Sequence, residues 1–281
     1  MAEAIGDAEL VPIRTSGDEG GASAALAEDK SRFVREIERA LLAGDVELAV
    51  HSAKDVPGEL PEGLEIVGVP AREDPADAWV GEAASLEEVH EGARVGTASL
   101  RRRSELLALR PDLEIVPLRG NVDTRLRRLA ERELDGIVLA AAGLRRLGRA
   151  DRIAFTLGIE EMTPAPGQGS LLLEGRAGDR RGAEVAAALT ERDALVELTA
   201  ERAAVTGLDA SCETPVGVCA RHRDGELVLW GFAGMPDGSE HIRETVRGDA
   251  AQPVALGEAL VERMAQAGAR ELLARAAGAA A

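Results

Sequence analysis

Lysine is nearly absent from this chain of 281 residues. Only Lys30 and Lys54 are lysines among its 33 basic residues, and all the others are arginines. Codon bias of a genome accounts for such an excess of arginine. The two remaining lysines are then either chance survivors or residues with specific roles, and their sequence context has to decide between the two.

The chain also lacks long apolar runs and has little cysteine. No stretch of about 18 apolar residues occurs, which excludes a membrane-spanning helix. The acidic N-terminal segment MAEAIGDAEL has neither the basic nor the apolar region of a signal peptide. Cys212 and Cys219 are too few for a zinc site, and a structural disulfide is not expected in the cytosol. We therefore predict a cytoplasmic protein without a metal ion.

Acidic residues outnumber basic ones by 50 to 33, giving a net charge of −17. Such a field repels nucleic acid and anionic membranes, so neither is an expected partner. The length and a hydrophobic content of 45% allow a sizeable core and more than one domain.

Strand and helix patterns alternate through the first two thirds of the chain. Residues 93–121 read as strand, helix, strand, and residues 122–148 as helix, strand, helix, which predicts a mostly parallel α/β sheet. A helix with Ser85 as N-cap is predicted over 85–92. Pro and Gly residues mark a hinge before an apolar strand in 163–175.

The last third has a different pattern and predicts a separate α+β domain. One long helix is expected over 183–208, and another over 255–276. Between them, two Asp-Gly turns separate alternating strands, which is typical of an antiparallel meander.

Arginines follow three predicted strands. Residues 101–103 begin a helix directly after the segment GTAS, Arg119 and Arg125 come after the next strand, and residues 145–146 after the third. Parallel strands carry ligands at their carboxyl ends, and arginine binds carboxylate or phosphate through both oxygens. In a chain this acidic, the pattern predicts a crevice for a small polyanion. A solvated basic face is the alternative.

The segment VELAVHSAKDVP places a charged pair at the end of a buried strand. Lys54 and Asp55 either face a ligand from opposite sides of the strand or form a surface ion pair, and Pro57 ends the strand. Cys212 lies in a turn of small residues, where a thiol can form a covalent bond or simply be packed. Cys219 falls within a strand pattern and is expected in the core.

Seven segments together resemble the porphobilinogen deaminase (hydroxymethylbilane synthase) family. They occur in the family's order and spacing and cover roughly residues 9–275. They are DKSRFVREIERALL, AVHSAKDVP, REDPADAWV, GTASLRRRSELLALRPDLEIVPLRGNVDTRL, LAAAGLRRLGRADRI, PAPGQGSLLLE and TAERAAVTGLDASCETPVG.

The resemblance implies three domains. Two lobes like those of type 2 periplasmic binding proteins would enclose the cleft, domain 1 from residues 1–70 and 168–188 and domain 2 from residues 71–167. Residues 189–281 would form a C-terminal α+β domain that carries the cofactor. The family's first strand and helix have no counterpart here, so lobe one is expected to lack them. A misplaced start or a truncated, inactive paralogue would explain this.

The resemblance also implies an activity. Members join four porphobilinogen molecules with loss of ammonia, building on a dipyrromethane cofactor held by a cysteine thioether. Each pyrrole carries an acetate and a propionate, so an arginine-rich cleft is expected. Asp55 matches the catalytic aspartate. Cys212 matches the covalent cofactor site, with Lys54, Thr97, Ser99, Arg101 and Arg102 around the cofactor. The substrate-binding matches are Lys30, Arg119, Arg125 and Arg146.

The family comparison leaves other interpretations open. A two-lobed module that binds a small anion is one, although it needs neither Cys212 nor residues 192–281. The family has glycine before the cofactor cysteine, whereas this chain has Ser211. We expect a monomer whose partner is porphobilinogen and which binds neither nucleic acid nor membrane.

Overall fold

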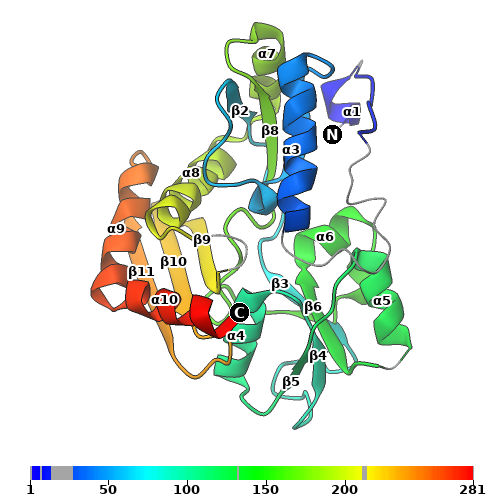
Figure 1. Ribbon diagram of the computed structural model, residues 1–281, viewed down its shortest axis with the longest axis vertical. Helices are drawn as coiled ribbons and strands as arrows, with labels where there is room; N and C mark the ends of the chain where they lie inside the picture. Colours follow the sequence, from blue (N-terminus) through cyan, green and yellow to red (C-terminus); the bar gives the residue numbers. More distant parts are fainter. Residues whose placement is uncertain (1, 7, 14–27, 132, 211–213, 281) are drawn as a thin grey trace.

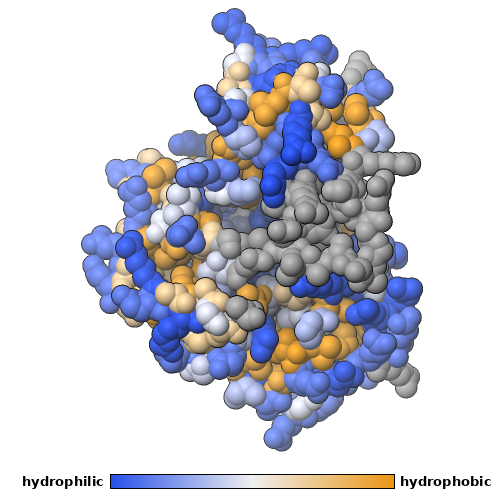
Figure 2. Space-filling view, in the orientation of Figure 1, coloured by the Kyte–Doolittle hydropathy of each residue, from blue (hydrophilic) through white to orange (hydrophobic). Residues whose placement is uncertain are grey.

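The structure is a computed structural model that describes residues 2–6, 8–13, 28–131, 133–210 and 214–280. Its strands form three separate sheets, each with its own helices (Figure 1). In the part of the chain that is described, no helix is both long and apolar enough to cross a membrane. Hydrophilic side chains cover much of the face in Figure 2, with smaller apolar patches between them.

The first sheet has the strand order β1-β8-β2, and β8 runs antiparallel to both neighbours. Its strands are β1 (Ala49–Ser52), β2 (Leu64–Gly68) and β8 (Leu171–Arg176). The helices α3 (Glu28–Ala43) and α7 (Arg180–Leu189) stand beside it at the top of Figure 1, and the short α1 (Ala2–Ile5) contacts α7. One 3-10 turn, η1 (Ala53–Asp55), follows β1 directly.

The second sheet is mixed. Its order is β5 (Glu114–Val116), β4 (Arg94–Gly96), β6 (Gly136–Ala140), β3 (Asp77–Gly81), β7 (Phe155–Thr156). β4 is parallel to β5 and β6, whereas β3 is antiparallel to β6 and β7. The helices α4 (Leu100–Leu109), α5 (Val122–Ala130) and α6 (Ala141–Arg146) each follow one parallel strand, and η2 (Ala150–Arg152) precedes β7.

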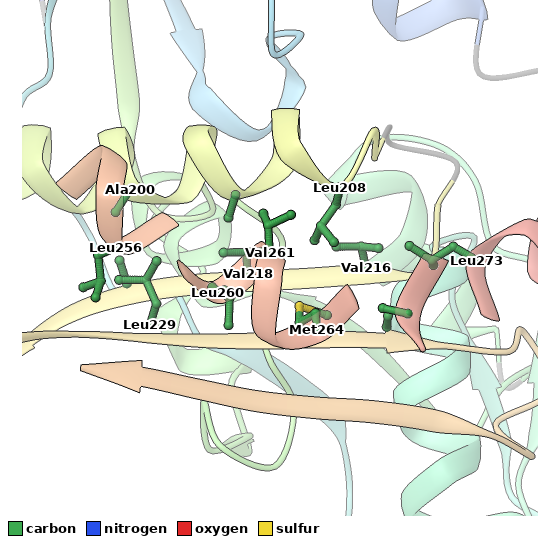
Figure 3. Close-up of a cluster of buried hydrophobic side chains, with 14 of the residues drawn as sticks. Ala200, Leu208, Val216, Val218, Leu229, Leu256, Leu260, Val261, Met264 and Leu273 are labelled. Atoms are coloured by element: carbon green, nitrogen blue, oxygen red, sulfur yellow. The ribbon is translucent and has the colours of Figure 1, made fainter. Parts of the chain in front are cut away.

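The third sheet is an antiparallel meander, as predicted. β9 (Val216–Arg223), β10 (Glu226–Gly234) and β11 (His241–Gly248) pair in sequence order. The helices α8 (Arg192–Gly207), α9 (Pro253–Gln266) and α10 (Ala269–Ala280) cover it. Figure 3 shows Leu256, Leu260 and Met264 of α9 between the helices and the strands, where each is buried. Burial of such side chains stabilises this unit by about 1.5–3 kcal/mol each.

Two segments connect the first sheet to the second, and we call them the crossing segments. Residues 69–76 lead from β2 to β3, and residues 157–170 lead from β7 to β8. They are hydrogen-bonded to each other from Glu73 N to Gly169 O at 3.0 Å. Each sheet lies within one of the three predicted domain ranges, while the domain boundaries themselves stay a prediction.

The structure confirms the fold class of two α/β lobes and an α+β domain, but several local predictions were wrong. Residues 85–92 form turns instead of a helix, with Ala84 N bonded to the Glu88 carboxylate. The predicted helix over 183–208 is two helices, because the backbone at Glu191 bonds to Val69 of a crossing segment. The last helix is also divided, at Gly268, whose φ is +94°. The second sheet is mixed because the chain enters β3 from the other lobe.

Candidate active site

The three parallel strands of the second sheet end at one edge, where their following segments bring arginines together. β5, β4 and β6 are neighbours, so the residues after Val116, Gly96 and Ala140 share this edge. The sequence prediction that three elements deliver arginine to one place is therefore consistent with the strand order.

Thr97 and Ser99 shape the turn from β4 into α4. Thr97 is buried, and its Oγ1 accepts a hydrogen bond from Ser99 N at 3.2 Å. Ser99 is the N-cap of α4 and accepts from Arg102 N at 3.4 Å. The cap satisfies a backbone donor at the helix start, which stabilises α4 by about 1 kcal/mol. Both hydroxyls thus position the residues that follow.

Arg101 and Arg102 enclose the carboxylate of Asp77. Arg101 Nη2 donates to Asp77 Oδ2 at 2.7 Å, and Arg102 donates to Oδ1 through Nε at 3.0 Å and Nη2 at 2.7 Å. Burial by itself raises the pKa of a carboxyl group. Here the two guanidinium groups more than offset burial and hold the pKa of Asp77 well below its usual range.

Arg101 also binds the buried carboxylate of Glu105. Arg101 Nη1 lies 2.7 Å from Glu105 Oε2, and Thr163 N donates to Glu105 Oε1 at 2.6 Å. Arg243, from β11 of the third sheet, lies 3.4 Å from the same Oε1. Complete burial raises the pKa of Glu105 to about 7, although Arg101 and Arg243 act in the opposite direction. This carboxyl group therefore titrates near neutral pH, between the second and third sheets.

Gln168 connects this network to the first sheet. Its side chain is fully buried, and its Oε1 accepts from Lys54 Nζ at 3.4 Å and from Arg102 Nη2 at 3.3 Å. Its Nε2 donates to Pro75 O at 2.7 Å and to Asp77 Oδ1 at 2.8 Å. Lys54 and Arg102 are therefore held at one point, although they follow strands of different sheets.

Lys54 and Asp55 lie in the 3-10 turn η1, so the prediction that they face opposite sides of a strand was wrong. β1 ends at Ser52, and both side chains are half-buried. Gly167 of a crossing segment packs against this turn with a φ of +73°. A Cβ atom at Gly167 would lie 2.9 Å from Ala53 C and from Lys54 N. Only glycine permits both this backbone conformation and this approach.

Arg125 and Arg146 add two further cations, and Arg146 contacts a crossing segment. Arg125 Nε donates to Gly120 O at 2.7 Å, and Arg146 Nη2 donates to Gly169 O at 2.6 Å. Desolvation lowers the pKa of both, and for Arg125 the nearby Arg102 contributes as well. Within the described part of the chain, their hydrogen bonds go to backbone carbonyls and leave their charge uncompensated by a bonded carboxylate. Arg119 is exposed beside Gly120.

The structure thus brings Lys54 and Arg102 to Gln168 and Arg146 to Gly169, and Arg125 lies near enough to Arg102 for that charge to lower its pKa. Cys212 lies outside the described residues, as does the side chain of Lys30 on α3. The prediction that Cys219 belongs to the core is confirmed, because it is fully buried and burial raises its thiol pKa far above the usual range. Among the described residues, no cluster of His, Cys, Asp or Glu is suited to a metal ion.

Sequence reasoning missed the buried charges that hold the crossing segments. Arg72 donates to Gln168 O at 3.0 and 2.9 Å and to Glu201 Oε1 of α8 at 2.7 Å. Glu201 Oε2 also accepts from Gly167 N at 2.6 Å. An aspartate at the head of the apolar strand DAWVG, and a glutamine between two glycines, were the available signals for Asp77 and Gln168.

Comparison with known proteins gives matches to two family models. The model described as "Porphobilinogen deaminase, dipyromethane cofactor binding domain" matches residues 1–184, and "Porphobilinogen deaminase, C-terminal domain" matches residues 195–266. Porphobilinogen deaminase of Syntrophus aciditrophicus is 46% identical over 267 residues, covering 94% of this chain and 87% of the relative. That of Thermus thermophilus is 47% identical over 265 residues, with the same coverage.

Solved structures give weaker matches. The periplasmic VFT2 domain of Bordetella pertussis BvgS is 19% identical and covers 54% of this chain and 64% of that chain, with a TM-score of 0.32. The L-cystine solute receptor of Neisseria gonorrhoeae is 14% identical and covers 54% and 63%, also with a TM-score of 0.32. Similarity at this level carries no argument about the site.

Proposed function

The chain belongs to the porphobilinogen deaminase family, and on this premise we propose how its residues carry out the family's reaction. It is a transferase of tetrapyrrole biosynthesis, a hydroxymethylbilane synthase. It joins four porphobilinogen molecules head to tail, releases ammonia at each addition, and yields hydroxymethylbilane.

The donor set of the site fits the dipyrromethane cofactor of this family. Each pyrrole ring carries an acetate and a propionate, and Lys54, whose Nζ donates to Gln168 Oε1, supplies an ammonium group for a cofactor carboxylate. Nearby, Arg125 and Arg146 bond to backbone carbonyls and to no carboxylate among the described residues, so their charge is available to the growing pyrrole chain. When bound through Cys212, the cofactor supplies the end to which pyrrole units are added.

We assign the substrate carboxylates to a second set of basic residues. Arg119, Arg125 and Arg146 follow the parallel strands of the second sheet, and Lys30 comes from α3 of the first. A planar guanidinium group binds both oxygens of a carboxylate, and these arginines come from separate elements. They are therefore suited to hold a chain of pyrroles at several points along one edge.

Asp55 is the proposed catalytic residue. The reaction breaks a carbon–nitrogen bond, forms a carbon–carbon bond and releases a ring proton. A carboxylate beside the reacting carbon stabilises the positive charge that develops as the amino group leaves, and it then accepts the ring proton. The turn η1 places Asp55 directly after Lys54, whose ammonium group is held by Gln168.

The predicted contacts of Thr97, Ser99, Arg101 and Arg102 with the cofactor stay predictions. What supports a role near the cofactor is their position at the edge where Lys54 and Arg125 also lie. In the structure, the two guanidinium groups hold Asp77, and the two hydroxyls shape the start of α4. We propose that Arg102, through Gln168, keeps Lys54 in place.

The remaining assignments follow the family. We propose three domains: residues 1–70 together with 168–188, residues 71–167, and residues 189–281. We also propose that the protein is a cytoplasmic monomer. Its partner is a small-molecule substrate, and neither nucleic acid nor membrane is a partner. The observation that carries the site assignment is the convergence of Lys54 and Arg102 on Gln168, because the two cations follow strands of different sheets.

The test combines an intact mass with turnover of porphobilinogen. We expect a mass excess equal to a dipyrromethane that is absent from Cys212→Ala. Asp55→Asn should keep the cofactor and lose turnover by about a hundredfold or more. A bare polypeptide mass would oppose the proposed function and favour an inactive paralogue or a binding protein. Full turnover in Asp55→Asn would refute only the catalytic role of Asp55 and would leave the proposed function standing.

A further inference from the structure

Arg202 of α8 holds the backbone that follows the Lys54–Asp55 turn. Its Nη2 donates to Pro57 O at 2.8 Å and to Gly58 O at 2.7 Å. The two elements also approach closely, because a Cβ atom at Gly58 would lie 3.2 Å from Thr206 Oγ1 of α8. One nitrogen of one side chain thus connects the helix to two consecutive carbonyls.

This contact involves a half-buried cation. Desolvation lowers the pKa of Arg202, and the charge of Glu174 acts in the opposite direction. A hydrogen bond from an ionised donor is stronger than a neutral one, so the two carbonyls are held more firmly than by an ordinary backbone contact. An arginine that served only solubility would extend into solvent instead.

The neighbouring residue holds the other side of the same turn. Glu201 Oε2 accepts from Gly167 N at 2.6 Å, and Gly167 packs directly against Ala53 and Lys54. Of two consecutive residues of α8, Arg202 therefore bonds to the backbone after the turn, and Glu201 bonds to the glycine that packs against the turn. Beyond Gly207, where α8 ends, the chain continues to Cys212.

We propose that Arg202 is a positioning residue that fixes the Asp55 carboxylate relative to the chain that carries Cys212. The inference rests on the proposed function, because it takes Asp55 as the catalytic group and Cys212 as the cofactor site. Arg202 contacts backbone carbonyls and so acts through the turn. In this proposal, α8, which precedes Cys212 in the chain, also determines the position of the Asp55 carboxylate.

The experiment compares Arg202→Gln and Arg202→Lys with Arg192→Gln. Arg192 is exposed at the start of α8 and makes no ion pair or hydrogen bond among the described residues, so it is a matched control. Hydrogen exchange of the backbone amides in residues 53–60 is measured first, by mass spectrometry. We expect faster exchange in Arg202→Gln alone, by about tenfold, because an ammonium nitrogen in Arg202→Lys can still reach the carbonyls.

Kinetics then separate positioning from substrate binding. For Arg202→Gln we expect kcat to fall by about tenfold to a hundredfold with KM unchanged within about twofold, since small misplacements of a catalytic group have effects of this size. The cofactor mass should be retained. Arg202→Lys should keep most of kcat, and Arg192→Gln all of it.

A double-mutant cycle with Asp55→Glu tests whether Arg202 acts through Asp55. If it does, Arg202→Gln should reduce kcat by less than about twofold in the Asp55→Glu background, where the carboxylate is already displaced. An equal loss in both backgrounds would overturn the proposal. So would a rise in KM with kcat unchanged, which would make Arg202 a substrate-binding residue, and so would unchanged exchange and kcat.

Two controls keep the outcomes distinct. If Arg202→Gln does not fold, Arg202→Met decides, because it keeps the aliphatic part of the side chain and removes the donor to Pro57 O and Gly58 O. Faster exchange in the 53–60 segment together with reduced kcat supports the proposal, and wild-type values for both oppose it. A wild-type chain with a bare polypeptide mass would refute the proposed function. The exchange measurement would still test the link between α8 and the turn.

Discussion

Lys54 and Arg102 donate to the same oxygen atom, Gln168 Oε1, at 3.4 and 3.3 Å. One residue follows β1 of the first sheet and the other lies in α4 beside the second. The amide orientation is fixed by the opposite end of the side chain, where Nε2 donates to the Asp77 carboxylate. A buried amide therefore connects Lys54, which follows the first sheet, to Arg102 beside the second.

Gln168→Glu should disrupt this junction in a pH-dependent way. The new carboxylate would place an oxygen against Asp77, so we expect a loss of about 1–3 kcal/mol in the free energy of unfolding at neutral pH. Repulsion raises the folded-state pKa of the new group, so its stability contribution is present at low pH and lost as the pH rises. Urea unfolding at pH 5 and pH 8 checks this, and a deficit that grows toward low pH would contradict it.

Asp77→Asn should be strongly destabilising. Asp77 neutralises two buried guanidinium groups, and removal of one partner from a buried ion pair costs about 3–5 kcal/mol. Asp151→Asn is the matched control, because Asp151 is exposed in η2. Denaturant unfolding measures both. A similar small effect of the two substitutions would show that Arg101 and Arg102 are neutralised in another way.

Glu105→Gln should alter how stability depends on pH. The pKa of Glu105 is raised to about 7, so its contribution is fully present below the unfolded-state pKa near 4.5 and is lost as the pH rises through about 7. The stability of the wild type relative to Glu105→Gln should therefore fall by up to about 3 kcal/mol from pH 4.5 to 7 and then level off. Parallel curves for the two proteins would show that the pKa of Glu105 is not raised.

Gly167→Ala should reduce turnover more than stability. Gly167 and Gly178 both have positive φ, 73° and 81°, so alanine costs each position about 1–2 kcal/mol. Only at Gly167 would the new Cβ meet the backbone of Ala53 and Lys54, whereas nothing lies within 4 Å at Gly178. We expect a loss of kcat of about tenfold or more in Gly167→Ala alone. Equal kcat in both variants, at equal unfolding temperatures, would oppose the role of this contact.

Much of the fold was predictable from local patterns. The Asp224–Gly225 turn has positive φ at both residues, 53° and 86°, as a tight hairpin requires, and the flanking alternation identified the meander. Arginines after successive parallel strands predicted one shared edge, because strand order follows from short crossovers. These signals are contained within a few tens of residues.

The Asp77–Gln168 contact was not predictable in this way, since its two residues are 91 positions apart in the chain. The break between α7 and α8 also depends on a contact between residues far apart in the chain, because Glu191 N bonds to Val69 O. The sequence around Glu191 does not predict this bond. The turn η1 was also missed, because an apolar strand pattern does not mark where the strand ends. Tertiary contacts decided each of these.

The anchoring of Arg72 also affects how the molecule can move. Arg72 lies in a crossing segment, yet it is bonded to Glu201 of α8 and to Gln168 of the other crossing segment. If the two lobes rotate against each other, the rotation axis has to pass near this buried ion pair, because displacing it would expose unpaired charges. The third sheet would then stay with the axis while the lobes swing on either side.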